Sequence, residues 1–260
     1  MTKDKLIVAL DVDSSRRALD LFEKLRDIAG MFKIGMQLFT AAGPNIVREI
    51  VSRGGRVFLD LKYHDIPNTV ASAGIEATRL GVSIFNVHAA GGGEMMKRTA
   101  AAVADVAARE NITRPKVIAV TLLTSLDREI LQQIGIEHEP SSIVSRLAML
   151  AHQSGLDGVV ASAQEIKIIR AAMPDPGFVI VTPGIRSSGN VSDDQRRTMT
   201  LAQAIQAGAD YLVVGRPILN AADPVKTAHE IADEIARTVS TQFDPSDLTE
   251  QSKVQGVHSE

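Results

Sequence analysis

Short apolar runs rich in β-branched residues recur along the chain and alternate with segments of helical periodicity. Each run is continuously apolar, a pattern typical of parallel strands that are covered on both faces. The runs are Leu6–Leu10, Met31–Ile34, Arg56–Leu61, Ile84–Val87, Lys116–Val120, Gly158–Val160, Phe178–Val181 and Tyr211–Val214. The amphipathic segments between them include Ser14–Ala29, Met95–Glu110, Ser141–Ser154 and Ala163–Met173.

This alternation, repeated about eight times, predicts an α/β fold: a closed (β/α)8 TIM barrel in a single domain. An open, doubly wound sheet is the alternative. Its best sign is a GxGxxG turn after the first strand, and the segment ALDVDSS (9–15) contains no glycine. No linker interrupts the pattern, so we expect residues 1–240 to form the barrel and the polar residues 241–260 to form a flexible tail.

Composition and charge exclude several classes of function. The 28 Lys and Arg residues nearly balance the 31 Asp and Glu residues, and only 3% of the chain is aromatic, which argues against a nucleic-acid surface. The absence of cysteine excludes disulfides, thiolate metal sites and a cysteine nucleophile. No apolar stretch approaches the roughly 18 residues of a membrane span, and the first apolar run is too short for a signal peptide. We therefore expect a cytoplasmic protein that binds neither nucleic acid nor membranes.

Polar residues follow the apolar part of nearly every predicted strand. In a parallel barrel the carboxyl ends of the strands form one face, and active sites lie there. Charges rarely converge on one face without a ligand, because buried unpaired charge is costly. The residues are Asp11, Lys33, Asp60, Lys62, Asn86, His88, Thr121, Thr182, Gly215 and Arg216. The long segments 123–142 and 184–200, which we expect to be loops, belong to the same face, although surface insertions are an alternative explanation.

The densest group of charges lies in FLDLKYHDIPNTV, residues 58–70. Side chains alternate along a strand, so Asp60 and Lys62 share the side that faces the barrel mouth. Two carboxylates close in sequence keep Lys62 in its ammonium form, which favours a proton donor over a Schiff-base nucleophile. Two structural explanations stay open: Asp60 and Lys62 as a plain ion pair, and Asp65 as the N-cap of the following helix.

Two segments carry the features of a phosphate site. VTPGIRSSG (181–189) and VVGRPI (213–218) follow the seventh and eighth strands, where barrels commonly bind phosphate. Gly184 and Gly215 allow close approach of the backbone, and Arg186 and Arg216 supply bidentate donors. A phosphorylated small molecule is therefore the expected ligand. In HAAGGGEMMK (88–97) the glycines make a turn, and we expect a local hydrogen bond at His88 rather than a metal.

Eight segments together match one family. They are VALD (8–11), FKIGMQLF (32–39), FLDLKYHDIPNTV (58–70), NVHAAGG (86–92), AVTLLTS (119–125), GLDGVV (155–160), VTPGIR (181–186) and VVGRPI (213–218). Over residues 6–235 the chain resembles the short bacterial form of the orotidine 5′-phosphate decarboxylase family. DxKxxDIPxT combined with TPGIR and VGR is very specific, whereas DxKxxD alone also occurs in related sugar-phosphate enzymes.

The resemblance implies decarboxylation of orotidine 5′-phosphate to uridine 5′-phosphate, the last step of pyrimidine nucleotide synthesis, without cofactor or metal. It implies that Lys62 gives the proton to C6 of the pyrimidine and that Asp60 lies beside the departing carboxylate. Lys33 and Asp65 would complete an alternating array of charges. The resemblance also implies a homodimer in which Asp65 and Thr69 would reach the partner's site.

The resemblance also implies a set of substrate-binding residues. Asp11 would contact the ribose, Thr124 and Ser125 the pyrimidine, and residues 187–195 would close as a lid. Lys33, Asp60 and Thr69 would also touch the substrate. The remaining contacts, mostly to the phosphate, would come from Pro183, Arg186, Gln195, Gly215 and Arg216.

Two other functions remain as alternatives. A magnesium-dependent sugar-phosphate enzyme would share DxKxxD, but such relatives place an acidic metal ligand where this chain has Lys33. A non-catalytic protein could keep the phosphate site alone, but phosphate binding needs none of the charges of Lys33, Asp60, Lys62 and Asp65.

Overall fold

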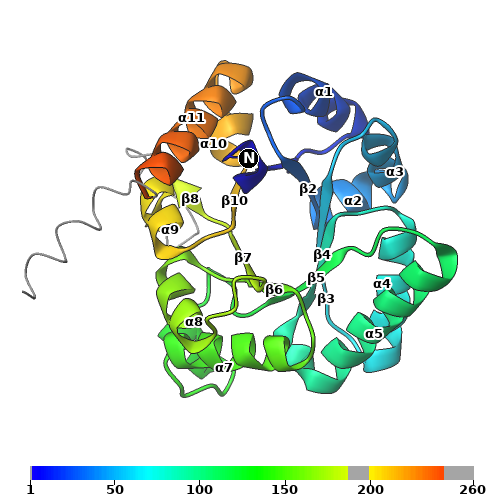
Figure 1. The fold of residues 1–260 in the computed structure, drawn as a ribbon, viewed down its shortest axis with the longest axis vertical. Coiled ribbons are helices and arrows are strands. Elements are labelled where there is room, and N and C mark those ends of the chain that lie inside the picture. The colour runs from blue at the N-terminus through cyan, green and yellow to red at the C-terminus, as the bar shows by residue number, and fades with distance from the viewer. Residues whose placement is uncertain (1, 187–198, 243–260) are drawn as a thin grey trace, which may run out of the picture.

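The computed structural model describes residues 2–186 and 199–242, and in this part of the chain eight parallel strands form a closed barrel (Figure 1). Strand β1 pairs with both β2 and β10, which closes the ring. The predicted barrel is confirmed, and the open doubly wound sheet is wrong. The strands are β1 (Leu6–Ala9), β2 (Met31–Gly35), β3 (Val57–Tyr63), β4 (Ile84–His88), β5 (Lys116–Val120), β6 (Gly158–Val160), β7 (Val179–Thr182) and β10 (Tyr211–Val214).

Helices surround the barrel in a ring (Figure 1). The α-helices are α1 (Ser15–Leu25), α2 (Met36–Ala42), α3 (Asn45–Ser52), α4 (Pro67–Arg79), α5 (Gly92–Glu110), α6 (Arg128–Gln133), α7 (Pro140–Gln153), α8 (Ile166–Ala172), α9 (Leu201–Ala207), α10 (Arg216–Leu219) and α11 (Pro224–Gln242). Short 3-10 turns precede β1, α5 and α8: η1 (Thr2–Lys5), η2 (Ala89–Gly91) and η3 (Ala163–Glu165).

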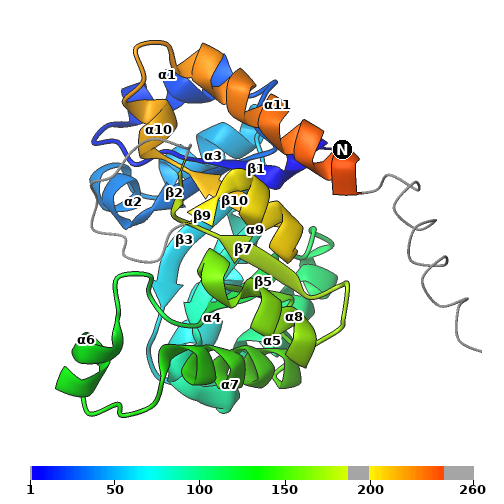
Figure 2. The same cartoon turned by 90° about the vertical axis from the view of Figure 1, so that its left-hand side faces the viewer.

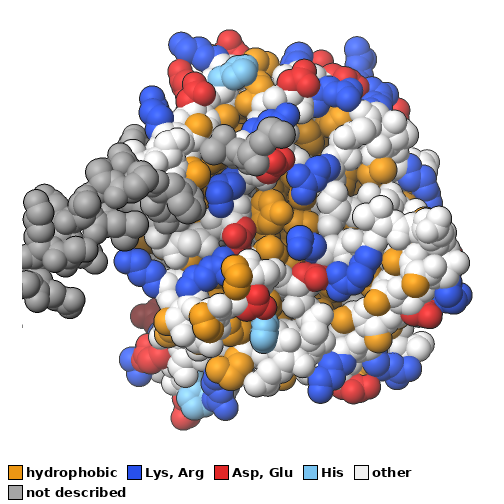
Figure 3. All heavy atoms as spheres, in the orientation of Figure 1, with side chains coloured by type: hydrophobic (Ala, Val, Ile, Leu, Met, Phe, Trp, Pro, Cys, Tyr) orange, Lys and Arg blue, Asp and Glu red, His pale blue; other side chains and the backbone are white. Residues whose placement is uncertain are grey.

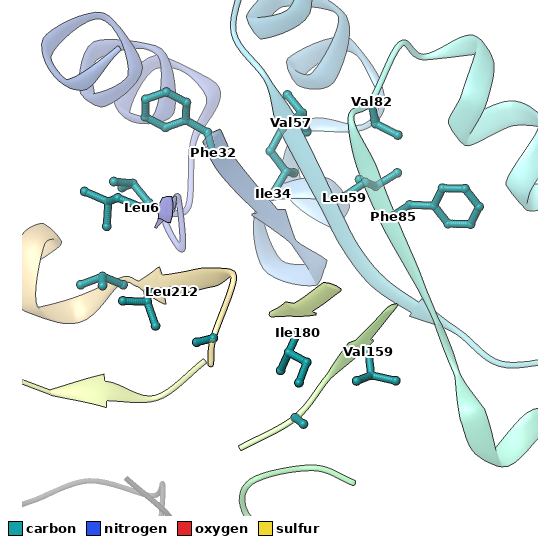
Figure 4. Close-up of a cluster of buried hydrophobic side chains, with 14 of the residues drawn as sticks. Leu6, Phe32, Ile34, Val57, Leu59, Val82, Phe85, Val159, Ile180 and Leu212 are labelled. Carbon is teal, nitrogen blue, oxygen red and sulfur yellow. The ribbon is translucent and has the colours of Figure 1, made fainter. Parts of the chain in front are cut away.

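Alternation along the strands divides the core into two layers. Within each strand, alternate residues such as Ile7, Phe58 and Ile118 fill the inside of the barrel. Their sequence neighbours point outward and pack beneath the helices, and Figure 4 shows members of this outer layer. Each fully buried side chain of this size contributes about 1.5–3 kcal/mol. The apolar runs are therefore continuous because both faces of each strand are buried.

Two segments that the sequence analysis treats as loops contain regular structure. Residues 123–142 include α6, which begins where the carboxylate of Asp127 accepts a hydrogen bond from the backbone N–H of Ile130 at 3.0 Å. After β7, β8 (Ile185–Arg186) pairs in parallel with β9 (Met199–Thr200). The lid expected over residues 187–195 lies outside the described residues, as does most of the predicted tail. Helix α11 continues through Gln242, two residues past the predicted domain boundary.

The two ends of the barrel face opposite sides of the molecule. The carboxyl ends of the strands lie on the side of α6, which projects from the body at the lower left of Figure 2. Figure 3 shows the opposite face, near η1, where Lys, Arg, Asp and Glu side chains surround a hydrophobic centre. The predicted site residues within the described part of the chain belong to the carboxyl-terminal face.

Candidate active site

Four charged side chains from the first three strands form a continuous row of ion pairs. Lys33 lies between two carboxylates, with its Nζ 2.9 Å from Oδ1 of Asp11 and 3.4 Å from Oδ2 of Asp60. The other oxygen of Asp60 accepts a hydrogen bond of 2.8 Å from Nζ of Lys62. Negative and positive groups therefore alternate in the order Asp11, Lys33, Asp60, Lys62.

Asp60 is the enclosed carboxylate of this row. Its side chain is 13% exposed, whereas that of Asp11 is 47% exposed. Burial acts to raise the pKa of Asp60, but the charges of Lys33 and Lys62 and the hydrogen bonds to Asp60 outweigh it and lower the pKa below the usual value. Asp60 therefore holds a fixed negative charge where solvent screens it little.

The ion pair between Lys33 and Asp11 lies directly against Gly35, the last residue of β2. A Cβ at this position would lie 2.9 Å from Nζ of Lys33 and 3.2 Å from Oδ1 of Asp11. Either group would have to move to admit it. Glycine at this position thus leaves room for the ion pair between β1 and β2.

Asn86, on β4, contacts both members of the Asp60–Lys62 pair. Its Nδ2 donates to Oδ1 of Asp60 at 2.7 Å, and its Oδ1 accepts from the backbone N–H of Lys62 at 2.8 Å. The residue is completely buried. From the sequence, Asn86 is only a polar residue at a strand end, with no predicted role.

Asp65 and Thr69 lie apart from this row. Both are exposed, Asp65 before α4 and Thr69 in its first turn. The carboxylate of Asp65 accepts a hydrogen bond of 2.6 Å from the backbone N–H of Ile66, and the structure gives it no ion pair among the described residues. The N-cap of α4 is Ile66, without a side-chain hydrogen bond, so the interpretation of Asp65 as the cap is wrong.

The remaining predicted residues that the structure describes follow β5, β7 and β10 at the same end of the barrel. Thr124 is half-buried and Ser125 exposed in the turn after β5, and Pro183 is half-buried after β7. Arg186 belongs to β8, and Gln195 lies outside the described residues. Gly215 and the exposed Arg216 follow β10. A Cβ on Gly215 would lie 3.6 Å from Oδ2 of Asp11, so the end of β10 adjoins the charged row.

His88, at the end of β4, accepts a local hydrogen bond, as predicted. Its Nδ1 lies 3.4 Å from the backbone nitrogen of Ala90, and its ring stacks on that of His64 with centroids 5.2 Å apart. Burial, followed by the charges of His64 and Lys62, lowers the pKa of His88. No local sequence pattern predicts the stacked pair, because the two residues come together only through the pairing of β3 with β4.

Comparison with known sequences decides the family. The model of the "Orotidine 5'-phosphate decarboxylase / HUMPS family" matches residues 4–231. The chain belongs to this family. The protein named orotidine 5'-phosphate decarboxylase from Moorella thermoacetica is 57% identical over 234 residues, which cover 90% of this chain and 92% of that protein. The protein of the same name from Trichlorobacter lovleyi is 53% identical, with 91% and 97% covered.

Two solved structures have a fold similar to that of this chain. The crystal structure of orotidine 5'-phosphate decarboxylase from Lactobacillus acidophilus matches with a TM-score of 0.78 at 35% identity, covering 88% of this chain and 98% of that one. An uncharacterized conserved protein from Geobacillus kaustophilus matches with a TM-score of 0.75 at 38% identity, covering 88% and 99%. Over the described residues, no helix has the length and apolarity to cross a membrane.

Proposed function

We propose that this chain decarboxylates orotidine 5′-phosphate to uridine 5′-phosphate, with Lys62 as the catalytic acid. The observation that carries the proposal is the alternation of charge along Asp11, Lys33, Asp60 and Lys62, with the ammonium of Lys62 held 2.8 Å from the partly buried carboxylate of Asp60. The similarity to proteins named orotidine 5'-phosphate decarboxylase, at 50–57% identity, supports the same activity.

The reaction breaks the bond between C6 of the pyrimidine and its carboxylate carbon. Carbon dioxide leaves, and the electron pair stays on C6 in an sp2 orbital that the ring cannot delocalise. The ammonium of Lys62 stabilises this carbanion and donates a proton to C6, after which the neutral amine regains a proton from water. The ammonium interacts more strongly with the carbanion than with the neutral ring carbon. It therefore stabilises the transition state more than the bound substrate, which lowers the activation free energy.

Asp60 serves two purposes in this proposal. Its carboxylate fixes the direction of the Lys62 ammonium. It also repels the substrate carboxylate, and the repulsion disappears as carbon dioxide leaves. We regard the repulsion as the smaller effect. Lys33 holds Asp60 anionic from the other side.

Binding energy from the rest of the nucleotide anchors the substrate away from C6. We assign Asp11 to the ribose, and Thr124 and Ser125 to the pyrimidine edge. The phosphate and its surroundings are assigned to Pro183, Arg186, Gln195, Gly215 and Arg216, with residues 187–195 as a lid. The substrate is a charged phosphate ester that does not cross a bilayer unaided, so we also propose a cytoplasmic location.

We further propose a homodimer in which Asp65 and Thr69 reach the partner's site. Two observations support it. Asp65 is exposed and forms no ion pair with the charged row among the described residues. Ile66 beside it is 67% exposed, an apolar side chain that a partner subunit could cover.

A spectrophotometric assay of orotidine 5′-phosphate, with purified protein and excess EDTA, tests the activity. We expect full turnover, because Lys33 occupies the space between Asp11 and Asp60 where a divalent cation would otherwise bind. Activity that requires added magnesium would favour the sugar-phosphate alternative. No loss of substrate under either condition would refute the proposed reaction.

A Lys62→Ala variant tests the acid. It should abolish turnover while uridine 5′-phosphate still binds, because the phosphate contacts are remote from C6. Equilibrium dialysis with labelled product measures that binding. Persistent turnover would show that Lys62 is only a structural ion-pair partner of Asp60.

A further inference from the structure

The pairing of β3 with β4 is interrupted at the Asp60–Lys62 pair. Leu59 pairs with Phe85 and Tyr63 pairs with Val87, so Asp60, Leu61 and Lys62 all lie opposite Asn86. Lys62 has a φ of 52°, in the left-handed region that non-glycine residues rarely adopt. The bulge removes the backbone N–H of Lys62 from the ladder and leaves it in need of another acceptor.

We propose that Asn86 is a positioning residue for the reaction: one buried amide fixes both the carboxylate that orients the Lys62 ammonium and the bulged backbone from which that side chain projects. The inference rests on the proposed function and deepens it. The 2.7 Å contact sets the carboxylate of Asp60, and the 2.8 Å contact sets the backbone of Lys62.

The primary amide of Asn86 satisfies both partners at once, because it carries a donor and an acceptor on one planar group. A backbone N–H requires an acceptor, and a carboxylate requires a donor, so the oxygen of Asn86 must face Lys62 and its nitrogen must face Asp60. A carboxylate would repel Asp60, and an aliphatic side chain would satisfy neither. Because Asn86 is completely buried, water cannot replace a lost partner without opening the site.

Because of the bulge, the contact between Asn86 and the backbone of Lys62 also affects the position of the Lys62 ammonium. Lys62 reaches Asp60 from a position only two residues away because the left-handed backbone turns its side chain back toward the strand. If the Lys62 N–H loses its acceptor, that conformation loses support and the ammonium shifts. A displacement of about 1 Å at a reacting group costs about 10²-fold in rate.

Two variants test this role. Asn86→Ala removes both contacts and should lower kcat about 10²-fold while the dissociation constant of uridine 5′-phosphate changes by less than about threefold. Asn86→Asp keeps the shape and the acceptor for Lys62 but places a second carboxylate against Asp60. The two carboxylates will share a proton, so the activity of Asn86→Asp relative to the unchanged protein should rise as the pH falls.

Other titratable groups surround Asp60 and residue 86. Lys33 and Lys62 form ion pairs with Asp60, Asp11 forms an ion pair with Lys33, and the charge of Lys62 acts on His88. They are present in every variant, so they do not explain a difference in pH profile between Asn86→Asp and the unchanged protein. That profile is a property that loss of stability alone does not alter.

Asp157→Ala is the matched control. The carboxylate of Asp157 also accepts a hydrogen bond from a neighbouring strand, the N–H of Val117 at 2.7 Å, but at the other end of the barrel. It should lose stability and keep kcat per folded molecule. Asn86 variants that behave like Asp157→Ala, with kcat and pH profile unchanged per folded molecule, would overturn the inference. Absence of activity in the unchanged protein would instead refute the proposed function.

Discussion

His88 makes the stability of the fold sensitive to mild acid. Its pKa is lowered, first by burial and then by the charges of His64 and Lys62, and its Nδ1 accepts a hydrogen bond only while unprotonated. The unfolded chain therefore binds a proton near pH 6.5, its ordinary value, before the folded chain does. Stability contributed by neutral His88 is present above pH 6.5 and is lost as the pH falls toward the lower, folded-state value.

A His88→Gln variant should reduce this acid sensitivity. Glutamine does not titrate, so the free energy of unfolding should fall less steeply between about pH 6.5 and pH 5 than in the unchanged protein. Urea denaturation at a series of pH values measures the slope. His138→Gln, at an exposed position on the loop before α7, is the control and should leave the slope unaltered. Equal slopes for all three proteins would contradict the assignment to His88.

The same Gly-x-Asp turn precedes two of the barrel strands. Before β6 and β10, a glycine with positive φ is followed two residues later by an aspartate: Gly155 by Asp157, and Gly208 by Asp210. Each aspartate accepts a hydrogen bond of 2.7 Å from the backbone of the neighbouring strand, at Val117 and Ile180. The helix-to-strand turn thus also fixes the lateral pairing of the strands.

Asp210→Ala should therefore destabilise the barrel by about 1–3 kcal/mol, the usual cost of a charged hydrogen bond lost from a partly buried site. Asp210 also pairs with Arg170 at 2.5 Å, as Asp157 pairs with Arg114 at 2.9 Å, so the two substitutions should cost similar amounts of stability. Thermal or urea unfolding measures both. Asp105→Ala, which removes an ion pair from exposed side chains of α5, should change stability by less than about 0.5 kcal/mol. An effect of Asp210→Ala as small as that of Asp105→Ala would refute this role.

The strands could be predicted from the sequence more fully than the site. A run such as Lys116–Val120 is buried on both faces, so local composition alone defines it. The bulge at Lys62 depends on the pairing of β3 with β4, which no local pattern encodes, and the role of Asn86 depends on the bulge. The short helix α6 does have a local sequence signal, the N-cap residue Asp127 followed by Glu129 in the first turn. Roles assigned to Thr124, Arg186 and Gln195 stay predictions.

At the scale of the whole molecule, the proposed dimer can be tested by combining two inactive chains. If Asp65 serves the partner's site, a mixed dimer of Lys62→Ala and Asp65→Ala subunits contains one intact site and one doubly altered site. Random mixing then restores about one quarter of all sites. We expect that recovery when the two variants are refolded together, measured by the decarboxylation assay. If each site used its own Asp65, every mixed site would be defective and no activity would return.

Closure of the barrel joins the two ends of the chain at the site. The charged row comes from β1, β2 and β3, whereas Gly215 follows β10, which pairs directly with β1. A ribosome therefore releases the charged row long before β10, the strand beside which we propose that the phosphate binds. A nascent or truncated polypeptide that lacks β10 contains Lys62 but not the proposed phosphate site. We therefore expect decarboxylation only after synthesis of the barrel is complete.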